Sequence, residues 1–335
     1  MGVVKADAYG HGAVPVARAL EDEGVGWLAV ATVPEAVALR EAGVGARVLV
    51  LAAPRPAFLA AYERHDLDVV VSSAEVARDV IARGGGLRAH VKVDTGMHRL
   101  GLSPAEAPAV VRQLGAAPGV EVAALWTHLA TADAADPSFA LEQVKRFDGV
   151  LAALGPDAPP LVHVRNGPSV VRLPPLTSRP ALVRLGGVLY GLASDPAMAP
   201  ATAGLRPAMR LVAEVVHVQT VEAGETVSYG RTWTAERPTR VATLAAGYAD
   251  GLPRAYAGPV GLGELRAPVV GRVCMDMLMV SLGGPGGTVR PGDEAVLWGP
   301  GGPTAEAAAE AAGTISYELT AGLTARVSRV HASDG

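Results

Sequence analysis

The stretch Val3-Val4-Lys5-Ala6-Asp7-Ala8-Tyr9-Gly10-His11-Gly12 places a lysine at the end of a short apolar run. Only three of the chain's 29 basic residues are lysines, and a second one lies in Val91-Lys92-Val93-Asp94-Thr95-Gly96-Met97. A lysine can lose its proton and then act as a nucleophile or base, whereas arginine stays charged at any workable pH. The alternative is that these lysines merely survive in an arginine-biased composition. That explanation suits Lys145, on an expected polar helix face, better than Lys5.

On both sides of Lys92, short apolar runs alternate with Ala-rich helical stretches. The expected strands are Val3–Ala6, Trp27–Thr32, Val48–Ala52, Leu67–Val71, His90–Val93, Val120–Trp126, Leu161–Val164 and Leu182–Leu185. This cadence is typical of a (β/α)8 barrel, although a doubly wound sheet gives a similar one. The barrel is favoured because polar and glycine residues fall at or just beyond many strand ends: Lys5, Arg99, His128, Asn166 and Gly186.

After about residue 204 the pattern changes to apolar runs separated by turn formers. The expected strands there are Met209–Gln219, Arg240–Ala246, Gly261–Arg266, Pro268–Val273 and Met277–Leu282. The sequence therefore predicts a (β/α)8 barrel over residues 1–204 and a smaller, mostly β domain over residues 205–335. A single barrel with a long insertion is the alternative.

Composition excludes several classes of protein. The net charge of −4 gives no reason to expect nucleic-acid or anionic-membrane binding. No uninterrupted apolar run is long enough to cross a bilayer. The single cysteine, Cys274, excludes an internal disulfide framework and fits a reducing cytoplasm. The histidines, including His11 and His163, show no metal-ligand spacing, so no metal site is expected and we interpret them as structural.

The Lys5 stretch closely resembles the pyridoxal-phosphate lysine signature of bacterial alanine racemases. The resemblance continues, in the family's order, through Lys92–Gly101, Thr127–Asp133, Val183–Gly191, Val227–Thr232, Gly247–Gly251 and Gly271–Asp276. One such motif is weak support, but an ordered set over nearly the whole chain is very specific. The resemblance implies a cytoplasmic isomerase that interconverts L- and D-alanine and supplies D-alanine for peptidoglycan.

The resemblance also implies which residues hold pyridoxal 5'-phosphate. Lys5 would bind it covalently, and Arg184 would donate to its pyridine nitrogen, discouraging protonation there. The phosphate would lie among Tyr9, Asn166, Gly167, Ser169, Gly186, Gly187 and Tyr317. The family usually has serine after the asparagine, where this chain has Gly167. Either Ser169 substitutes for that serine or backbone N–H groups alone bind the phosphate.

Racemisation needs proton removal on one face of the substrate Cα and return on the other, which two opposed bases achieve. By resemblance, Lys5 serves the D-enantiomer and Tyr229 the L-enantiomer, with His128 linking Tyr229 to Arg184. Arg99, Lys92 and the Met275 backbone would bind the substrate carboxylate. Lys92 is either carbamylated, as the family lysine can be, or a plain lysine paired with an acidic residue. The residues matching the access corridor are Asp133, Tyr248, Arg254 and Arg272.

Family members form homodimers in which the β domain of one subunit covers the barrel of the other, so composite sites are expected. Two alternatives remain: a serine or broad-specificity racemase, and a non-catalytic pyridoxal-phosphate-binding protein. The second domain and Tyr229 argue against the latter. Family members also carry a strand and a helix ahead of the Lys5 strand. The sequence is therefore expected to be N-terminally incomplete, and a divergent form is the alternative.

Overall fold

The computed structural model describes residues 1–176, 179–284 and 287–332. The chain divides into two compact units. The first contains Met1–Leu189 and Asp195–Ala203, and the second contains Tyr190–Ser194 and Gly204–Gly335. Each unit is described by itself below.

The first unit is built on a seven-stranded parallel sheet with strands in chain order. Its strands are β1 (Gly2–Val3), β2 (Trp27–Val30), β3 (Arg47–Val50), β4 (Leu67–Val71), β5 (Leu87–Lys92), β6 (Val120–Trp126) and β7 (Leu161–His163). The segment 181–185 closes the ring, because Ala181 and Arg184 bridge to the β7 side and Leu185 bridges to Gly2. This closure confirms the predicted barrel, with the eighth strand reduced to isolated bridges.

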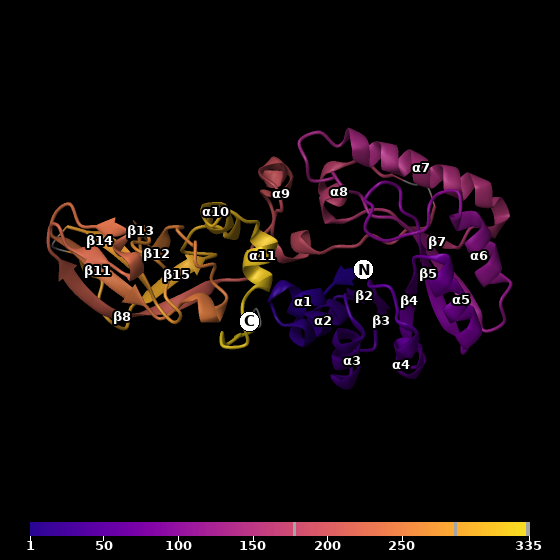
Figure 1. Ribbon diagram of the computed structural model, residues 1–335, viewed down its shortest axis with the longest axis horizontal. Helices are drawn as coiled ribbons and strands as arrows, with labels where there is room; N and C mark the ends of the chain where they lie inside the picture. Colours follow the sequence, from indigo (N-terminus) through magenta and orange to yellow (C-terminus); the bar gives the residue numbers. More distant parts are fainter. Residues whose placement is uncertain (177–178, 285–286, 333–335) are drawn as a thin grey trace. The chain divides into compact units, whose positions relative to one another are not determined.

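Helices follow the strands and lie around the outside of the sheet (Figure 1). They are α2 (Ala13–Asp22), α3 (Val33–Glu41), α4 (Leu59–Arg64), α5 (Ala74–Arg83), α6 (Ala107–Gly115), α7 (Ser138–Leu154), α8 (Gly167–Arg172) and α9 (Ala199–Thr202). Side-chain caps explain where several begin. Thr32 and Glu35 form a capping box on α3, and Ser73 accepts from the N–H of Val76 on α5.

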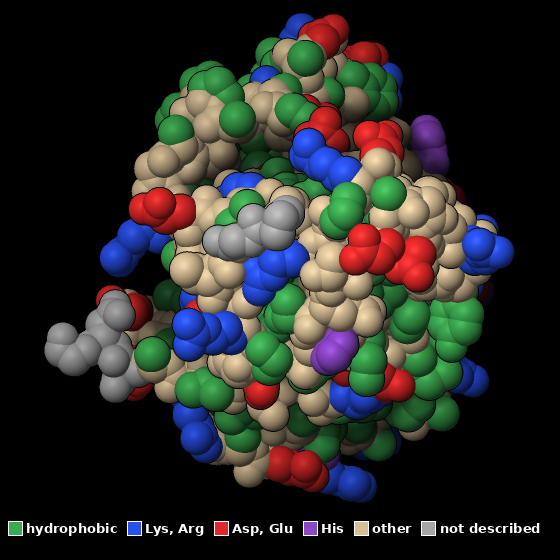
Figure 2. Space-filling view, turned by 90° about the vertical axis from the view of Figure 1, so that its left-hand side faces the viewer, with side chains coloured by type: hydrophobic (Ala, Val, Ile, Leu, Met, Phe, Trp, Pro, Cys, Tyr) green, Lys and Arg blue, Asp and Glu red, His purple; other side chains and the backbone are tan. Residues whose placement is uncertain are grey.

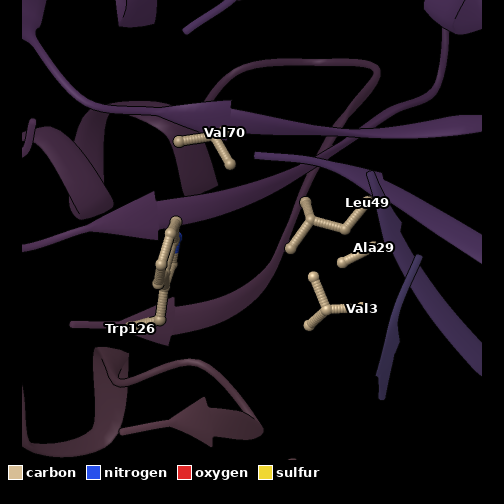
Figure 3. Close-up of a cluster of buried hydrophobic side chains, with 5 residues drawn as sticks. All are labelled: Val3, Ala29, Leu49, Val70 and Trp126. Atoms are coloured by element: carbon tan, nitrogen blue, oxygen red, sulfur yellow. The ribbon is translucent and has the colours of Figure 1, made fainter. Parts of the chain in front are cut away.

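One cluster inside the barrel is apolar. Figure 3 shows Val3, Ala29, Leu49, Val70 and Trp126, from five different strands, converging on one space. All are buried, and burying a side chain of Val or Leu size contributes roughly 1.5–3 kcal/mol. Since successive side chains in a strand alternate between faces, the residues two positions away also point inward. Several of those residues are charged, a feature developed below.

The second unit contains a six-stranded sheet in the order β13-β12-β15-β8-β11-β14. Its strands are β8 (Leu211–Val221), β11 (Thr239–Leu244), β12 (Val260–Leu262), β13 (Leu265–Ala267), β14 (Leu278–Gly283) and β15 (Glu294–Trp298). A small hairpin joins β9 (Thr226–Val227) and β10 (Trp233–Thr234), and two helices follow, α10 (Ala305–Ala311) and α11 (Ser316–Ala321). On the face that Figure 2 shows, basic, acidic and apolar side chains are interspersed.

Several expected boundaries were wrong. The first strand ends at Val3 rather than Ala6, because the backbone turns left-handed after Lys5. The expected strand Gly261–Arg266 is a hairpin of β12 and β13. The stretch Pro268–Val273 contributes a single bridge, from Val269 to Val280. Strand β15 was not expected, although it lies between β12 and β8 in the sheet.

Candidate active site

Lys5 lies where β1 ends and an unusual turn begins. The four residues after it, Ala6 to Tyr9, have φ between 52° and 55°, which is the left-handed helical region. A non-glycine residue costs about 1–2 kcal/mol there, so four in succession form a strained segment. The label α1 (Lys5–Tyr9) therefore denotes a left-handed turn, which Gly10 ends at φ 84°.

Side chains and backbone groups around the turn hold it in place. Glu35 Oε1 accepts from the N–H of Ala6 at 2.7 Å, and Asp7 Oδ1 accepts from the N–H of Ala13 at 2.8 Å. The His11 ring lies 3.0 Å from the carbonyl oxygens of both Ala8 and Tyr9. These contacts fix the backbone on which Lys5 stands, and strain that is held in this way is common at functional sites.

Lys5 is half-buried, and burial lowers the pKa of its amine below the ordinary lysine value. The nearby charge of Arg99 lowers this pKa further, while Glu35 acts in the opposite direction. A lysine with a lowered pKa is a better nucleophile and base near neutral pH. The environment of Lys5 therefore suits the chemistry predicted for it.

Four cations of the barrel converge on this region. Lys92 is 3 % exposed, and burial together with the charges of Arg99 and Arg184 lowers its pKa to about 8. Arg184 is also 3 % exposed, and burial and the charge of Arg99 lower its pKa to about 9. Cations that lower one another's pKa are stabilised when an anion binds among them. The cluster of Lys5, Lys92, Arg99 and Arg184 is therefore suited to anionic ligands.

Arg184 is held by groups that accept hydrogen bonds. Its Nη1 donates to the His163 carbonyl at 2.5 Å and to His163 Nδ1 at 3.1 Å. Its Nη2 donates to the Thr127 carbonyl at 2.9 Å and to His128 Nδ1 at 3.2 Å. The guanidinium also lies over the Trp126 ring, 4.9 Å from its centroid. The predicted link between His128 and Arg184 is thus present in the structure.

His128 is a neutral imidazole held in a defined orientation. Burial, followed by the charges of Arg184, Arg99, Lys92 and Lys5, lowers its pKa well below the ordinary histidine value. Arginine has no acceptor, so His128 Nδ1 accepts from it and Nε2 carries the ring hydrogen. Gln143, which is fully buried, donates to the His128 carbonyl at 3.0 Å and fixes the loop.

Of the residues expected around a phosphate, Asn166, Gly167, Ser169, Gly186 and Gly187 lie at the last two strand positions of the barrel, whereas Tyr9 follows β1 and Tyr317 is on α11. Asn166 caps α8 by accepting from the N–H of Ser169, and the Ser169 hydroxyl donates to the Asn166 carbonyl at 2.8 Å. Ser169 is fully buried and bonded within the chain, which favours the backbone around Gly167 as the phosphate donor. A Cβ on Gly186 would lie 2.5 Å from the Tyr9 hydroxyl. Glycine at position 186 therefore leaves room for Tyr9.

Most of the other predicted residues belong to the second unit. Tyr229 is 66 % exposed and Met275 is 52 % exposed. Tyr229 follows Ser228, whose φ of 67° is left-handed and whose hydroxyl donates to the Arg272 carbonyl at 2.6 Å. The backbone of Gly247 lies against that of Met275, where a Cβ would come within 2.2 Å of the carbonyl oxygen.

These contacts bring Tyr229, Arg272, Met275 and Tyr248 together within the second unit, since the Tyr248 N–H donates to the Cys274 carbonyl. Arg254 is exposed on the same β11–β12 connection as Tyr248, and Tyr317 lies half-buried on α11. Asp133, in the first unit, lies between two residues whose carbonyls accept from Arg172.

Part of the barrel interior is polar in a way that the sequence motifs did not predict. His163, interpreted as structural, contacts Arg184 directly and is fully buried. Behind it lie two further buried titratable residues, His90 and Asp68. The signal was present in the sequence, because Asp68 and His90 interrupt apolar strands at positions that alternation directs inward.

Within the described ranges, no group of three or more His, Cys, Asp or Glu side chains is arranged to hold a metal ion. Over the same residues, no helix combines the length and the apolar character needed to span a membrane.

Both units of the chain match known alanine racemases. Residues 1–194 match the family model "Alanine racemase, N-terminal domain", and residues 208–331 match "Alanine racemase, C-terminal domain". An alanine racemase of Chlorobaculum tepidum is 40 % identical over 341 residues, covering 98 % of this chain and 88 % of the relative. One of Deinococcus radiodurans is 44 % identical over 329 residues, covering 97 % and 90 %.

Solved structures of alanine racemases also superpose on this chain. The biosynthetic alanine racemase of Pseudomonas aeruginosa superposes with a TM-score of 0.91 at 39 % identity, covering 99 % of this chain and 92 % of that structure. The alanine racemase of Streptomyces lavendulae gives a TM-score of 0.88 at 39 % identity, covering 98 % and 88 %.

Proposed function

The chain belongs to the alanine racemase family, and we propose that it interconverts L- and D-alanine with pyridoxal 5'-phosphate bound to Lys5. The observation that carries the proposal is the convergence of Lys5, Lys92, Arg99 and Arg184 around one strained strand end. A phosphorylated cofactor and an amino-acid carboxylate are the two anions that such a site would bind.

The residues present fit the cofactor. Lys5 has a lowered pKa, as covalent attachment to an aldehyde requires, and Tyr9 stands against Gly186 at the expected phosphate position. Asn166, Gly167, Gly186, Gly187 and Tyr317 would complete that position, with Ser169 shaping it from behind. When bound, the cofactor supplies an electron-withdrawing ring that makes the substrate Cα–H acidic.

Arg184 would face the pyridine nitrogen of the ring. Because the guanidinium is a permanent donor, it disfavours protonation of that nitrogen and so limits the ring's withdrawal of electrons. Its hydrogen bonds to His163 and His128 prevent it from turning away. The site would therefore be suited to removing the substrate Cα proton and returning one, as racemisation requires.

Two bases would move the proton. Lys5 Nζ serves one face of the substrate Cα, and the Tyr229 hydroxyl serves the other. A phenol is a weak base at neutral pH, because its ordinary pKa is about 10. The ring N–H that remains on His128, at Nε2, is the donor that would stabilise the Tyr229 phenolate.

The substrate carboxylate would be bound by the Arg99 guanidinium, whose fork geometry matches a carboxylate, with help from Lys92 and the Met275 backbone. Asp133, Tyr248, Arg254 and Arg272 would line the corridor through which the amino acid reaches the site. D-Alanine made in the cytoplasm by this route would supply peptidoglycan synthesis.

We further propose that the working unit is a homodimer. Tyr229 and Met275 are 66 % and 52 % exposed in the single chain, which is more than residues in an assembled active site would be. In the proposed dimer the second unit of one subunit covers the barrel of the other, so that each site combines Lys5 of one chain with Tyr229 of the second chain.

Two measurements on the purified protein test the function. The bound cofactor should give a visible absorption band that borohydride abolishes, and alanine should be racemised faster than serine. Lys5→Arg should remove the band, whereas Lys145→Arg, which changes an exposed lysine on α7, should keep it. An unchanged borohydride-sensitive band in Lys5→Arg would refute the assignment of Lys5. Faster turnover of serine would favour the broad-specificity alternative, and a band without any racemisation would favour a binding protein.

A further inference from the structure

Three buried titratable residues inside the barrel are not used by the proposed reaction. Asp68 on β4, His90 on β5 and His163 on β7 are each fully buried. Barrel interiors are normally filled by branched apolar side chains, as in the apolar cluster that Figure 3 shows. Burying a carboxylate and two imidazoles is costly unless each is paired, so their partners are informative.

The three residues form an unbroken chain of hydrogen bonds that ends at Arg184. Asp68 Oδ2 lies 3.0 Å from His90 Nε2, and His90 Nδ1 lies 2.9 Å from His163 Nε2. His163 Nδ1 lies 3.1 Å from Arg184 Nη1. Each imidazole uses both ring nitrogens, so the chain of hydrogen bonds runs without a break from Asp68 on β4 to the Arg184 guanidinium.

The direction of every hydrogen bond in this chain follows from Arg184, which has only donors. His163 Nδ1 must accept from it, and burial with the Arg184 charge lowers the pKa of His163 well below the ordinary value, so the ring is neutral. The hydrogen of His163 is therefore on Nε2 and points to His90 Nδ1, which must accept. The hydrogen of His90 is then on Nε2 and points to the Asp68 carboxylate.

Asp68 provides the negative charge that terminates the chain. Burial alone would raise the pKa of Asp68, but the His90 hydrogen bond and the charges of Arg88 and Arg47 hold it below its usual value. Arg88 Nε donates to Asp68 at 2.6 Å and Arg47 Nη2 donates at 3.1 Å. The carboxylate therefore stays ionised and can only accept.

Aromatic contacts keep the two imidazole rings from turning. Trp126 stacks on His163 with a centroid distance of 5.1 Å and an interplanar angle of 10°. Trp27 meets His90 edge to face at 5.4 Å. The same Trp126 ring lies under Arg184, so one side chain orients both His163 and the guanidinium.

We propose that Asp68 and His90 are positioning residues for Arg184, and that their hydrogen bonds hold His163 in the Nε2–H tautomer so that Arg184 always has an acceptor at Nδ1. If His163 carried its hydrogen on Nδ1, two donors would face each other and the guanidinium would have to move. The effect on a bound cofactor rests on the proposed function, whereas the tautomer of His163 does not.

Substitutions at position 90 separate this role from simple packing. In His90→Gln the amide oxygen can accept from His163 while the amide nitrogen donates to Asp68. This variant therefore keeps the donor-to-acceptor direction of both hydrogen bonds. His90→Leu removes both bonds, and Asp68→Leu removes the terminal acceptor. Val70→Ala is the matched packing control, because Val70 is fully buried and pairs with His90 across β4 and β5.

The test uses the cofactor-loaded enzyme labelled with ¹⁵N-histidine, with the His163 signals assigned by their loss in His163→Gln. Wild type and His90→Gln should show the neutral Nε2–H tautomer at His163. In His90→Leu and Asp68→Leu we expect mixed tautomers, a shifted visible band of bound pyridoxal phosphate and a roughly tenfold lower kcat. Val70→Ala should lower thermal stability without changing the tautomer or the band.

An Nδ1–H tautomer at His163 in wild type would overturn the proposal. So would a His90→Leu or Asp68→Leu enzyme that departs from wild type no further than Val70→Ala does. A wild-type protein with the Nε2–H tautomer but no bound pyridoxal phosphate would refute the proposed function while supporting the hydrogen-bond direction.

Discussion

Glu35 Oε1 accepts a hydrogen bond from the backbone N–H of Ala6, 2.7 Å away, at the residue that follows Lys5. Its other oxygen accepts from the N–H groups of Ala31 and Thr32 at the start of α3. One carboxylate therefore ties the left-handed turn to the neighbouring βα loop. The turn persists because its surroundings hold it, since its own residues do not prefer that conformation.

Ala6→Gly should leave the free energy of unfolding unchanged or raise it by up to about 1 kcal/mol, because glycine adopts the left-handed region without strain. The control is Ala38→Gly, at an exposed position within the right-handed helix α3, which should cost about 1 kcal/mol. Urea unfolding of both variants measures the difference. If Ala6→Gly destabilises the protein as much as Ala38→Gly does, Ala6 is not strained.

Lys92 should make stability depend on pH. Its pKa falls from 10.5 to about 8 on folding, so between these values the unfolded chain binds a proton that the folded chain has released. Stability therefore rises with pH through this window and is lost as pH falls from 10.5 to 8. Relative to Lys92→Met, wild type should gain about 1–2 kcal/mol between pH 8 and 9.5.

Urea unfolding in CO₂-free buffer measures this gain, and Lys145→Met controls for removing a lysine from an exposed site. A wild-type protein whose stability follows that of Lys92→Met across the window would show that Lys92 does not titrate there.

Gly186→Ala should weaken cofactor binding. The new Cβ would lie 2.5 Å from the Tyr9 hydroxyl and 3.1 Å from Cζ, so Tyr9 would have to move. Overpacking of this kind costs about 1–3 kcal/mol, which corresponds to a roughly 5- to 150-fold higher Kd for pyridoxal phosphate. Equilibrium titration of the cofactor measures it. Gly149→Ala, on α7 with nothing within 4 Å of its Cβ, should bind normally.

A mixture of two inactive variants should recover activity if the sites are composite. Lys5→Ala lacks one base and Tyr229→Phe lacks the other. In a mixed dimer, one site receives both substitutions and the other site receives neither. Partial racemase activity after subunit exchange is therefore expected. Exchange demonstrated by mass spectrometry without any recovery would show that both bases come from the same chain.

The barrel could be predicted from the sequence, because its strands and helices leave local signals. Alternating apolar and helical stretches predicted β4 and β6 to the residue, and lysine scarcity pointed to Lys5 before any resemblance was considered. The left-handed turn had no such signal, since alanine at positions 6 and 8 favours right-handed helix.

Non-local features were the harder part. Strand β15 is a five-residue run, Glu294–Trp298, that resembles any short apolar segment until it pairs with β8 and β12. Likewise, Asp68 and His90 are 22 positions apart in sequence, and the contact between them follows from the pairing of β4 with β5. Alternation directs them inward, but only the closed barrel shows that they reach Arg184 through His163.

The bridges that close the barrel also set an order of events during synthesis. β1 pairs with β2 on one side, but its other neighbour is the segment 181–185, which leaves the ribosome much later. At about 5–20 residues per second, the Lys5 strand waits on the order of 10–40 seconds for that second neighbour. Throughout that interval the strand that leads to Lys5 has one unpaired edge, and the burial that lowers the pKa of Lys5 is complete only when the ring closes.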